Sequence, residues 1–236
     1  MDIAIAVATL LLASLVHATF GFGTALVAMP ILVIAYGLPV ATPVVGLAAL
    51  TTTCIVLRSQ WRKVDIHSAK DLLVASLLGL PVGLVLLVNF PGPWLERLLG
   101  LLIIAYSGAH LVGYRYPRIE SRVLAYVFGF VSGVLGGAYN TNAPPVVVYA
   151  ALSGWDPAKF RATLQGFFLP SALLIVVGHG VAGLWSTRVF ELVLWSLPAI
   201  VLSNFIGARI AAKIEPARYL RFVYLILAVL GGAMLF

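Results

Sequence analysis

The 236-residue chain is 62% hydrophobic and only 10% charged, and it carries a net charge of +7. A soluble domain has roughly 25% charged residues, so this composition excludes a water-soluble protein and indicates an integral membrane protein. The hydrophobic stretches are long and rich in Leu, Val, Ala and Ile, which predicts membrane helices and not alternating strands. The basic residues fall in a few short loops, so the charge indicates topology and makes a nucleic-acid partner unexpected.

Apolar segments of the first half are expected at residues 3–20, 25–37, 41–57, 71–90 and 95–113. Those of the second half are expected at residues 122–136, 143–153, 160–178, 188–208 and 219–236. The N-terminus lacks the basic region of a cleaved signal peptide, so we expect the first segment to be a retained span. A full crossing takes about 20 residues, so the short segments 25–37 and 143–153 are predicted to be half-helices or arms of re-entrant hairpins.

Lys and Arg residues set the expected orientation, because they favour cytoplasmic loops. They form three clusters, which are Arg58, Arg62, Lys63 and Lys70, then Arg115, Arg118 and Arg122, and finally Arg209, Lys213, Arg218 and Arg221. The loops around residues 37–42, 90–95 and 178–187 contain no Lys or Arg. This pattern predicts opposite orientations for the two halves, with both termini outside.

The two halves also match in sequence. A register of 114 residues pairs Pro30 with Pro144, and a later register of 124 residues pairs Trp61 with Trp185. The change of register predicts an insertion in the third segment of the second half. We therefore expect one membrane domain over residues 1–236, an all-α polytopic helical bundle of two inverted-topology repeats, about 1–114 and about 120–236, with short broken or re-entrant helices. Inverted repeats are typical of secondary transporters.

Glycines interrupt the apolar sequence at matching places in the two halves. The first copy reads Phe20-Gly21-Phe22-Gly23-Thr24 and leads to Pro30. The second copy reads Leu135-Gly136-Gly137-Ala138-Tyr139 and continues through Asn140-Thr141-Asn142 to Pro144. Non-helical backbone at membrane depth is tolerated only where it is buried in protein or lines a cavity. Paired breaks of this kind therefore indicate a transporter binding site.

These stretches resemble the sulfite exporter TauE/SafE family of membrane permeases. The residues that carry the resemblance are Phe20-Gly21-Phe22-Gly23 with Met29-Pro30-Ile31-Leu32, then Gly129-Phe130-Val131-Ser132-Gly133-Val134-Leu135-Gly136-Gly137 with Asn142-Ala143-Pro144-Pro145-Val146, and finally Trp155-Asp156-Pro157 with Phe160-Arg161-Ala162-Thr163. The resemblance covers essentially the whole chain. It implies transport of small sulfur oxyanions or organic anions such as sulfite and sulfonates, and it implies no catalytic residue.

The residues themselves predict an anion site built from backbone. Helix N-termini offer free N–H groups and a partial positive charge. Glycine lets the backbone approach a ligand, and proline suits the first turn of a helix. We expect the N-termini near residues 24–30 and 140–144 to face one another at mid-depth. The alternative is that the glycines only permit close helix packing.

Polar side chains add candidates to this backbone site. Residues 140–142 form the most polar cluster of an apolar region, so they are expected to face the interior and either bind ligand or tie helices together. Gln165 is a further candidate, whereas threonines 51–53 are expected to bond their own helix. Asn204 is expected to serve either packing or ligand contact. The candidate substrate-binding residues are Gly21, Phe22, Gly23, Thr24, Pro30, Gly136, Gly137, Asn140, Thr141, Asn142, Pro144 and Gln165.

His17 is an ionisable side chain well inside the first span. It is predicted either to couple a proton to transport or to be a neutral packing residue. His67, His110 and His179 are expected in or near loops without metal-ligand spacing, so neither a metal site nor a cofactor is expected. Cys54 is expected to pack as a small hydrophobe, with a redox role as the alternative.

We therefore predict a non-enzymatic secondary transporter, multi-pass in the plasma membrane, that exports a small sulfur-containing anion by alternating access. The sequence has no nucleotide-binding motif, so a gradient is the expected energy source, with a separate subunit as the alternative. Three alternatives remain open, namely a passive anion channel, an intramembrane enzyme and a scaffold subunit without transport of its own. The expected partners are the small anion and membrane lipid, and a homo-oligomer is left open.

Overall fold

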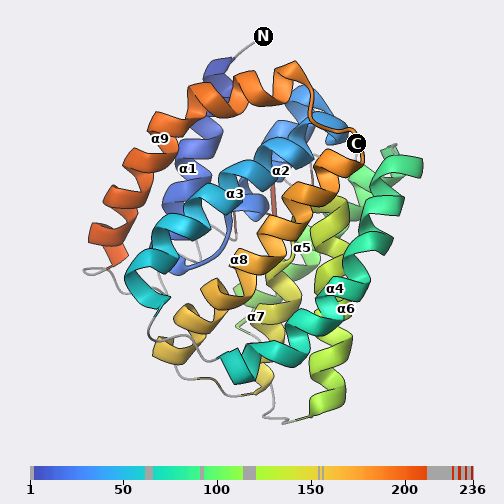
Figure 1. Ribbon diagram of the computed structural model, residues 1–236, viewed down its shortest axis with the longest axis vertical. Coiled ribbons are helices and arrows are strands. Elements are labelled where there is room, and N and C mark those ends of the chain that lie inside the picture. Colours follow the sequence, from blue (N-terminus) through green and yellow to red (C-terminus); the bar gives the residue numbers. More distant parts are fainter. Residues whose placement is uncertain are drawn as a thin grey trace.

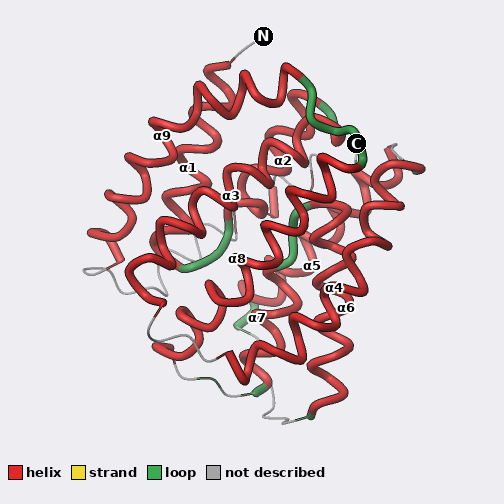
Figure 2. The backbone as a smooth tube through the Cα atoms, in the orientation of Figure 1, coloured by secondary structure: helices red, strands yellow, loops and turns green. Residues whose placement is uncertain are grey.

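The computed structural model describes residues 3–61, 66–90, 93–113, 121–153, 155 and 157–211, together with residues 225, 228, 229, 232 and 235. Regular structure in these ranges is entirely helical (Figures 1 and 2). The helices of the first half are α1 (Ile3–Phe20), α2 (Thr24–Tyr36), α3 (Leu38–Gln60), α4 (Ile66–Asn89) and α5 (Pro93–Leu111). Those of the second half are α6 (Arg122–Tyr139), α7 (Ala143–Leu152), α8 (Pro157–Val181) and α9 (Thr187–Ala211). The expected last segment, 219–236, lies largely outside the described residues.

Six helices are long and apolar enough to cross a membrane, namely α1, α3, α4, α6, α8 and α9. This confirms the predicted polytopic helical membrane protein. The short segments are also short in the structure, because α2 has 13 residues and α7 has 10. At 1.5 Å per residue these helices are about 20 and 15 Å long, and neither spans a hydrocarbon core of about 30 Å by itself.

Both short helices follow a break in the backbone. Between α1 and α2, Gly21 and Gly23 have φ values of 89° and 117°, which glycine adopts without steric strain. Between α6 and α7 the break falls at residues 140–142, where Asn140 is left-handed with φ 56°. The expectation that Gly136 and Gly137 form the second break is therefore wrong, since α6 continues to Tyr139. Asn tolerates the left-handed region better than other residues that have a Cβ.

Helix starts correct the expected register between the halves. Arg122 of α6 lies 119 residues after Ile3 of α1, and Ala143 of α7 lies 119 residues after Thr24 of α2. Pro157 of α8 likewise lies 119 residues after Leu38 of α3. The registers of 114 and 124 do not fit these helices, and α8 is only two residues longer than α3, with 25 residues against 23. The next helix, α9, begins 121 residues after α4, so the register changes by two residues after α8, in place of the expected step from 114 to 124. The nearly constant register supports the proposal of two repeats.

Helices of the two halves pack in matched pairs. In Figure 1, α1 lies beside α9, α4 lies beside α6, and α3 and α8 run side by side between these pairs. In each outer pair one helix comes from the first half and one from the second. The halves are therefore interlocked, and the two loops that break α1–α2 and α6–α7 are held within one helical bundle.

Glycines allow the close approach of α4 to α6. A Cβ at Gly133 would collide with the carbonyl oxygen of Ser76, and one at Gly79 would collide with that of Phe130. On the opposite pair, a Cβ at Gly207 of α9 would lie 2.6 Å from the Cβ of Ala18 in α1. Gly79 and Gly83 of α4 and Gly207 of α9 thus lie at close helix contacts. Small residues have this role in membranes because lipid provides no hydrophobic force that would drive helices together.

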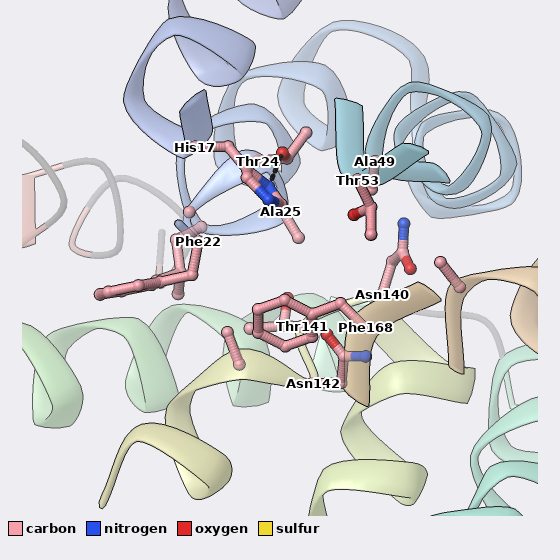
Figure 3. Close-up of a pocket in the computed structure, with 14 residues that line it drawn as sticks. His17, Phe22, Thr24, Ala25, Ala49, Thr53, Asn140, Thr141, Asn142 and Phe168 are labelled. Atoms are coloured by element: carbon pink, nitrogen blue, oxygen red, sulfur yellow. Dashed lines mark hydrogen bonds between the residues drawn. The ribbon is translucent and has the colours of Figure 1, made fainter. Parts of the chain in front are cut away.

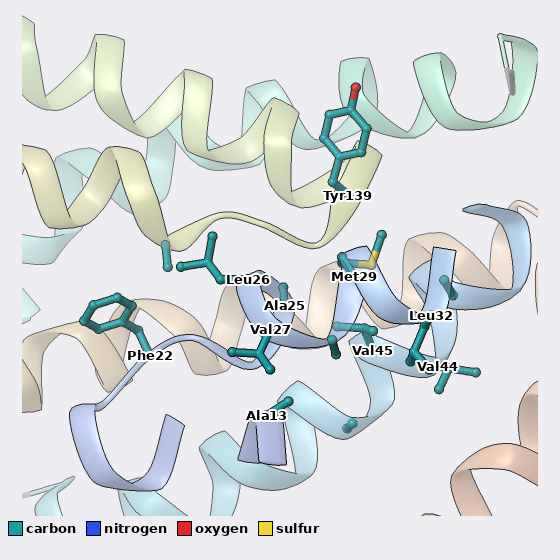
Figure 4. Packing of buried hydrophobic residues seen from close by; sticks show 14 of the residues in the cluster. Ala13, Phe22, Ala25, Leu26, Val27, Met29, Leu32, Val44, Val45 and Tyr139 are labelled. Carbon is teal, nitrogen blue, oxygen red and sulfur yellow. The ribbon is translucent and has the colours of Figure 1, made fainter. Parts of the chain in front are cut away.

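Buried apolar side chains surround α2, which runs through the interior. Figure 4 shows Leu26, Val27, Met29 and Leu32 of α2 against side chains of α1, α3 and α6. Met29 and Leu32 are completely buried. This environment fixes the position of the α2 N-terminus relative to the broken end of α6.

Candidate functional site

A cavity opens where the two helix breaks meet. It lies between the α1–α2 break, the α6–α7 break and the middle of α3 and α8 (Figure 3). The lining residues are His17, Phe22, Gly23, Thr24, Ala25, Leu26, Ala49, Thr53, Asn140, Thr141, Asn142, Ala143, Phe168 and Ala172. Its volume is about 30 Å³, above the roughly 10–15 Å³ that one water molecule requires. The cavity therefore admits only a small ligand.

Two helix N-termini face this cavity. Gly23 caps α2 without any side-chain hydrogen bond, and the first turn of α2, from Thr24 to Leu26, lines the cavity. Val27 is the first residue whose N–H bonds back to the Gly23 carbonyl, at 3.1 Å. Ala143, which begins α7, lines the same cavity. The first N–H groups of a helix have no intrahelical acceptor and carry its positive dipole end, so these ends favour an anion. The α7 end supplies fewer donors than the α2 end, because Pro144 and Pro145 have no N–H. The predicted meeting of the two N-termini is thus present in the structure.

A buried hydrogen-bond network joins His17 to the first of these ends. His17 Nδ1 lies 2.7 Å from Thr24 Oγ1, and its Nε2 lies 3.4 Å from Gln165 Oε1. Gln165 Nε2 donates to the Gly21 carbonyl. Because that carbonyl can only accept, the Gln165 amide oxygen must face His17, whose Nε2 must then be the donor. In neutral His17 the Thr24 hydroxyl consequently donates to Nδ1.

The second break contributes a donor without a partner. Asn140 is 5% exposed, and its Nδ2 has no hydrogen-bond partner among the described residues. Figure 3 shows its amide projecting toward the side of the cavity formed by Thr53 and Ala49. Neighbouring residues are held locally, because Ser132 Oγ donates to the Asn142 carbonyl at 2.7 Å and the Thr141 hydroxyl donates to the Tyr139 carbonyl at 3.1 Å. The Ser132 bond uses only the backbone carbonyl of Asn142, so the Asn140 and Asn142 side chains, which both line the cavity, remain available to a ligand.

The structure brings most of the predicted site residues together. Those that line the cavity are His17, Phe22, Gly23, Thr24, Asn140, Thr141 and Asn142. Gly21 and Gln165 lie directly behind them in the His17 network. The predicted side chains at the two breaks thus form one constellation although 116 residues separate Thr24 from Asn140.

Four further predicted residues belong neither to the cavity lining nor to the His17 network. Pro30 was expected in the first turn of its helix, but it is the seventh residue of α2 and is buried in the core. Pro144 is the second residue of α7, as expected for a first turn, and it lines a neighbouring apolar pocket. A Cβ at Gly136 would lie 3.2 Å from the Asn142 Cβ, and one at Gly137 would collide with the Leu80 carbonyl of α4. This geometry favours a positioning role for Gly136 and a packing role for Gly137.

Sequence reasoning missed the contribution of α3 and α8. Ala49 and Thr53 line the cavity from α3, and Phe168 and Ala172 line it from α8. In the register of 119, Ala49 pairs with Phe168 and Thr53 with Ala172. The correct register would have found them as matched positions of the two halves.

The remaining polar residues of the sequence analysis fall into two groups. Thr51 bonds the Leu47 carbonyl of its own helix, as predicted. Thr52 instead donates to Ser14 Oγ at 3.2 Å, and Asn204 Nδ2 lies 3.4 Å from the Thr52 hydroxyl. This cluster ties α1, α3 and α9 together outside the cavity, so Asn204 has a packing role. Cys54 is exposed on the surface of the helical bundle, contrary to the expected packed position.

His179 lies near a loop, as predicted, because it is two residues before Val181, the last residue of α8. It is nevertheless completely buried.

The comparison with protein families found a match over almost the entire chain. The family model described as sulfite exporter TauE/SafE matches residues 6–234. The chain belongs to the sulfite exporter TauE/SafE family. Comparisons with curated proteins and with solved structures found no match. The resemblance predicted from the sequence motifs is thereby confirmed, and the cavity described above lies within a membrane permease of this family.

Proposed function

We propose that this TauE/SafE family protein is a secondary transporter that exports small sulfur-containing anions across the plasma membrane, with sulfite as the first candidate. Family membership supports the class of substrate. The observation that carries the proposal is the convergence, in one buried cavity, of two helix N-termini and the unpartnered Asn140 amide. A deprotonated oxyanion presents hydrogen-bond acceptors, so a cavity lined with donors suits it without a buried cation.

The hydrogen bonds of the His17 network support the proposal that one side of the cavity is closed. Gln165 ties α8 to the end of α1 through His17 and the Gly21 carbonyl. Along α8, Gln165 lies between the cavity residue Phe168 and the basic residues Lys159 and Arg161 near the start of the helix. We propose that this contact closes the cavity toward the cytoplasm and that it breaks when alternating access exposes the site to that side.

His17 is proposed to couple a proton to anion movement. While the imidazole is neutral, the Thr24 hydroxyl donates its proton to Nδ1. Once His17 is protonated, Nδ1 becomes a donor, and the Thr24 hydroxyl can turn its own proton toward the cavity. Protonation would therefore add both a positive charge and a donor to the site, which would favour binding of an anion.

Thermal shift on the purified protein tests the substrate class. Sulfite, sulfate, thiosulfate, a sulfonate and a carboxylate would be compared at equal ionic strength, and we expect sulfite to raise the melting temperature most. A ligand that binds only the folded state stabilises it by mass action, about 2.7 kcal/mol at a hundred times its Kd. If no anion in this set stabilises the protein, the proposal is contradicted.

Asn140→Leu tests the site itself. This change removes an unpartnered donor while keeping a similar volume. Leucine costs about 1–2 kcal/mol at the left-handed φ of 56°, so the protein should fold with somewhat lower stability and lose its response to sulfite. Asn204→Leu is the matched control, because Asn204 is a buried amide outside the cavity, 3% exposed. An unchanged sulfite response in Asn140→Leu would remove Asn140 from the site.

A passive anion channel is the alternative function. The two differ in energetics, because a channel cannot move an anion against its own gradient. Proteoliposomes under an imposed proton gradient should accumulate sulfite above its external concentration if transport is coupled. Flux that stops at equal concentrations on both sides would favour the channel.

A further inference from the structure

Gly46 and Gln165 occupy corresponding positions in the two halves, since they lie 119 residues apart. Gln165 reaches across to the Gly21 carbonyl at the first helix break. The counterpart of Gly21 in the same register is Asn140, at the second break. Gly46 has no side chain to offer Asn140. The hydrogen bonding on the two sides of the cavity is therefore unequal.

The His179 ring lies beside Gly46, where a side chain at position 46 would otherwise project. A Cβ at Gly46 would lie 3.4 Å from Asn140 Nδ2, 3.4 Å from His179 Nδ1 and 3.5 Å from His179 Cε1. These are ordinary van der Waals distances, so a methyl group on Gly46 would fit and would contact both side chains. Asn140 and His179 thus converge from α6 and α8 on one small space over the α3 backbone.

Both side chains have buried polar atoms without a hydrogen bond of good geometry. Among the described residues, Asn140 Nδ2 and both ring nitrogens of His179 lack one, and the Gly137 backbone lies close enough to interact with the His179 ring. His179 is 0% exposed and Asn140 is 5% exposed. Groups buried in this way reduce stability unless a ligand or water satisfies them. The amide is a donor, and neutral His179 can donate from Nδ1, so one oxygen acceptor above Gly46 would bind both.

The electrostatic surroundings of His179 suit an anion. The groups that act on its ring are the surrounding apolar atoms and the Gly137 backbone, and no described carboxylate is among them. An anionic oxygen placed there would meet two donors and no described negative charge. A cation in the same place would meet the donor face of the Asn140 amide.

Gly46 and His179 both lie beyond the cavity lining along their helices. Along α3, Gly46 is three residues before the lining residue Ala49, toward the start of the helix. Along α8, His179 is seven residues beyond the lining residue Ala172, about 10 Å toward the end of the helix. Both directions lead to loops without Lys or Arg. Gln165 lies in the opposite direction along α8.

We propose that Asn140 and His179, above Gly46, form a second oxyanion subsite. A sulfur oxyanion places one oxygen there as it leaves the main cavity away from the basic loops. This inference rests on the proposed transport function and names the next place that the anion occupies. Asn140 belongs to both subsites and passes the anion from one to the other.

Gly46→Ala is the first test, because its methyl group fills the space that the oxygen requires. Sulfite should still raise the melting temperature as in the wild type, since Gly46 does not line the main cavity and its methyl group would meet Asn140 Nδ2 only at van der Waals distance. The maximal rate of sulfite transport in proteoliposomes should fall at least tenfold. Gly108→Ala is the matched control, because a Cβ at Gly108 of α5 meets nothing within 4 Å.

His179→Phe is the second test, since it keeps a flat ring and removes both nitrogens. If His179 has no ligand, loss of these unpaired groups should leave transport intact and stability equal or higher. The subsite predicts the same stability with at least a tenfold loss of maximal rate. Wild-type rates in both variants would overturn the subsite while leaving the main site standing, and they are also the result expected if only water sits above Gly46. Failure of the wild type to bind or move any anion would instead overturn the proposed function, and the subsite with it.

Discussion

Thr24 connects three parts of the site. It is the first residue of α2, its hydroxyl bonds His17 Nδ1 at 2.7 Å, and it lines the cavity. The same oxygen therefore meets the helix end, the ionisable group and the ligand space. Because the His17 tautomer decides where the hydroxyl proton points, Thr24 is the residue through which protonation would change the affinity of the cavity.

Replacement of Thr24 by valine should weaken sulfite binding about tenfold, because one hydrogen bond of about 1–1.5 kcal/mol is lost while the shape is kept. Isothermal titration calorimetry on the purified protein would give the two dissociation constants. Thr42→Val is the control, since the buried Thr42 hydroxyl bonds the Leu38 carbonyl of its own helix at 2.8 Å. Equal affinities for Thr24→Val and wild type would show that the hydroxyl does not contact the anion.

Replacement of His17 by glutamine should separate binding from coupling. Glutamine can still bond Thr24 and Gln165 but cannot be protonated at physiological pH, so sulfite should still stabilise the variant. Accumulation of sulfite driven by a proton gradient should fall to the level reached without the gradient. Proton-driven accumulation at the wild-type level would show that His17 is a packing residue, the alternative left open by the sequence.

Glycines of α6 determine how closely the helices α4 and α6 can pack. Gly129, Gly133 and Gly137 follow one another at intervals of four residues, and a Cβ at each would collide with an α4 carbonyl. Gly133→Ala should therefore lower the free energy of unfolding by about 1–3 kcal/mol, the usual range for overpacking. Gly108→Ala again provides a control without steric conflict. A melting temperature for Gly133→Ala equal to that of the control would contradict the close α4–α6 contact.

The same packing changes the interpretation of Gly137. It was predicted to contact substrate because it repeats the glycine of the first break. The structure places it against α4, so Gly137→Ala should reduce stability and leave the sulfite affinity of the folded protein unchanged. A titration in detergent below the melting temperature measures this directly. A large loss of affinity with normal stability would restore Gly137 to the site.

Sequence reasoning predicted the long helices well because a run of about 20 apolar residues has few structural alternatives. It also identified Thr24, residues 140–142 and His17, since polar groups within apolar sequence must be buried in protein. It misplaced the second break because glycine serves both as a helix breaker and as a packing residue in membranes. That error of five residues shifted the register, so Gly46 was not recognised as the counterpart of Gln165.

At the scale of the whole molecule, the cavity lies where equivalent parts of both halves meet. Five pairs of its lining residues are separated by the register of 119, which are Phe22 and Thr141, Gly23 and Asn142, Thr24 and Ala143, Ala49 and Phe168, and Thr53 and Ala172. A site shared equally by two inverted repeats can be exposed to either side by similar motions. The polar side chains differ within these pairs, so the two exposed states need not bind the anion equally.

The proposed inversion makes a prediction about topology. In a variant whose Cys54 is replaced, new cysteines at Phe90 and Trp185 should react with an impermeant thiol reagent added outside intact cells. Cysteines at Trp61 and Val112 should react only after permeabilisation, because they lie near the basic clusters. All four native side chains are exposed, at 52%, 42%, 61% and 84% respectively. Labelling of all four positions from one side would contradict the orientation of the halves.

The central claim is that a small oxyanion binds between the N-termini of α2 and α7. Crystals of the wild-type protein grown with selenite, the selenium analogue of sulfite, would locate the anion by its anomalous scattering. We predict a selenium peak in the cavity, with oxygens within hydrogen-bond distance of Thr24 Oγ1 and Asn140 Nδ2. Selenium peaks found only beside surface Lys and Arg residues, with none in the cavity, would contradict the site.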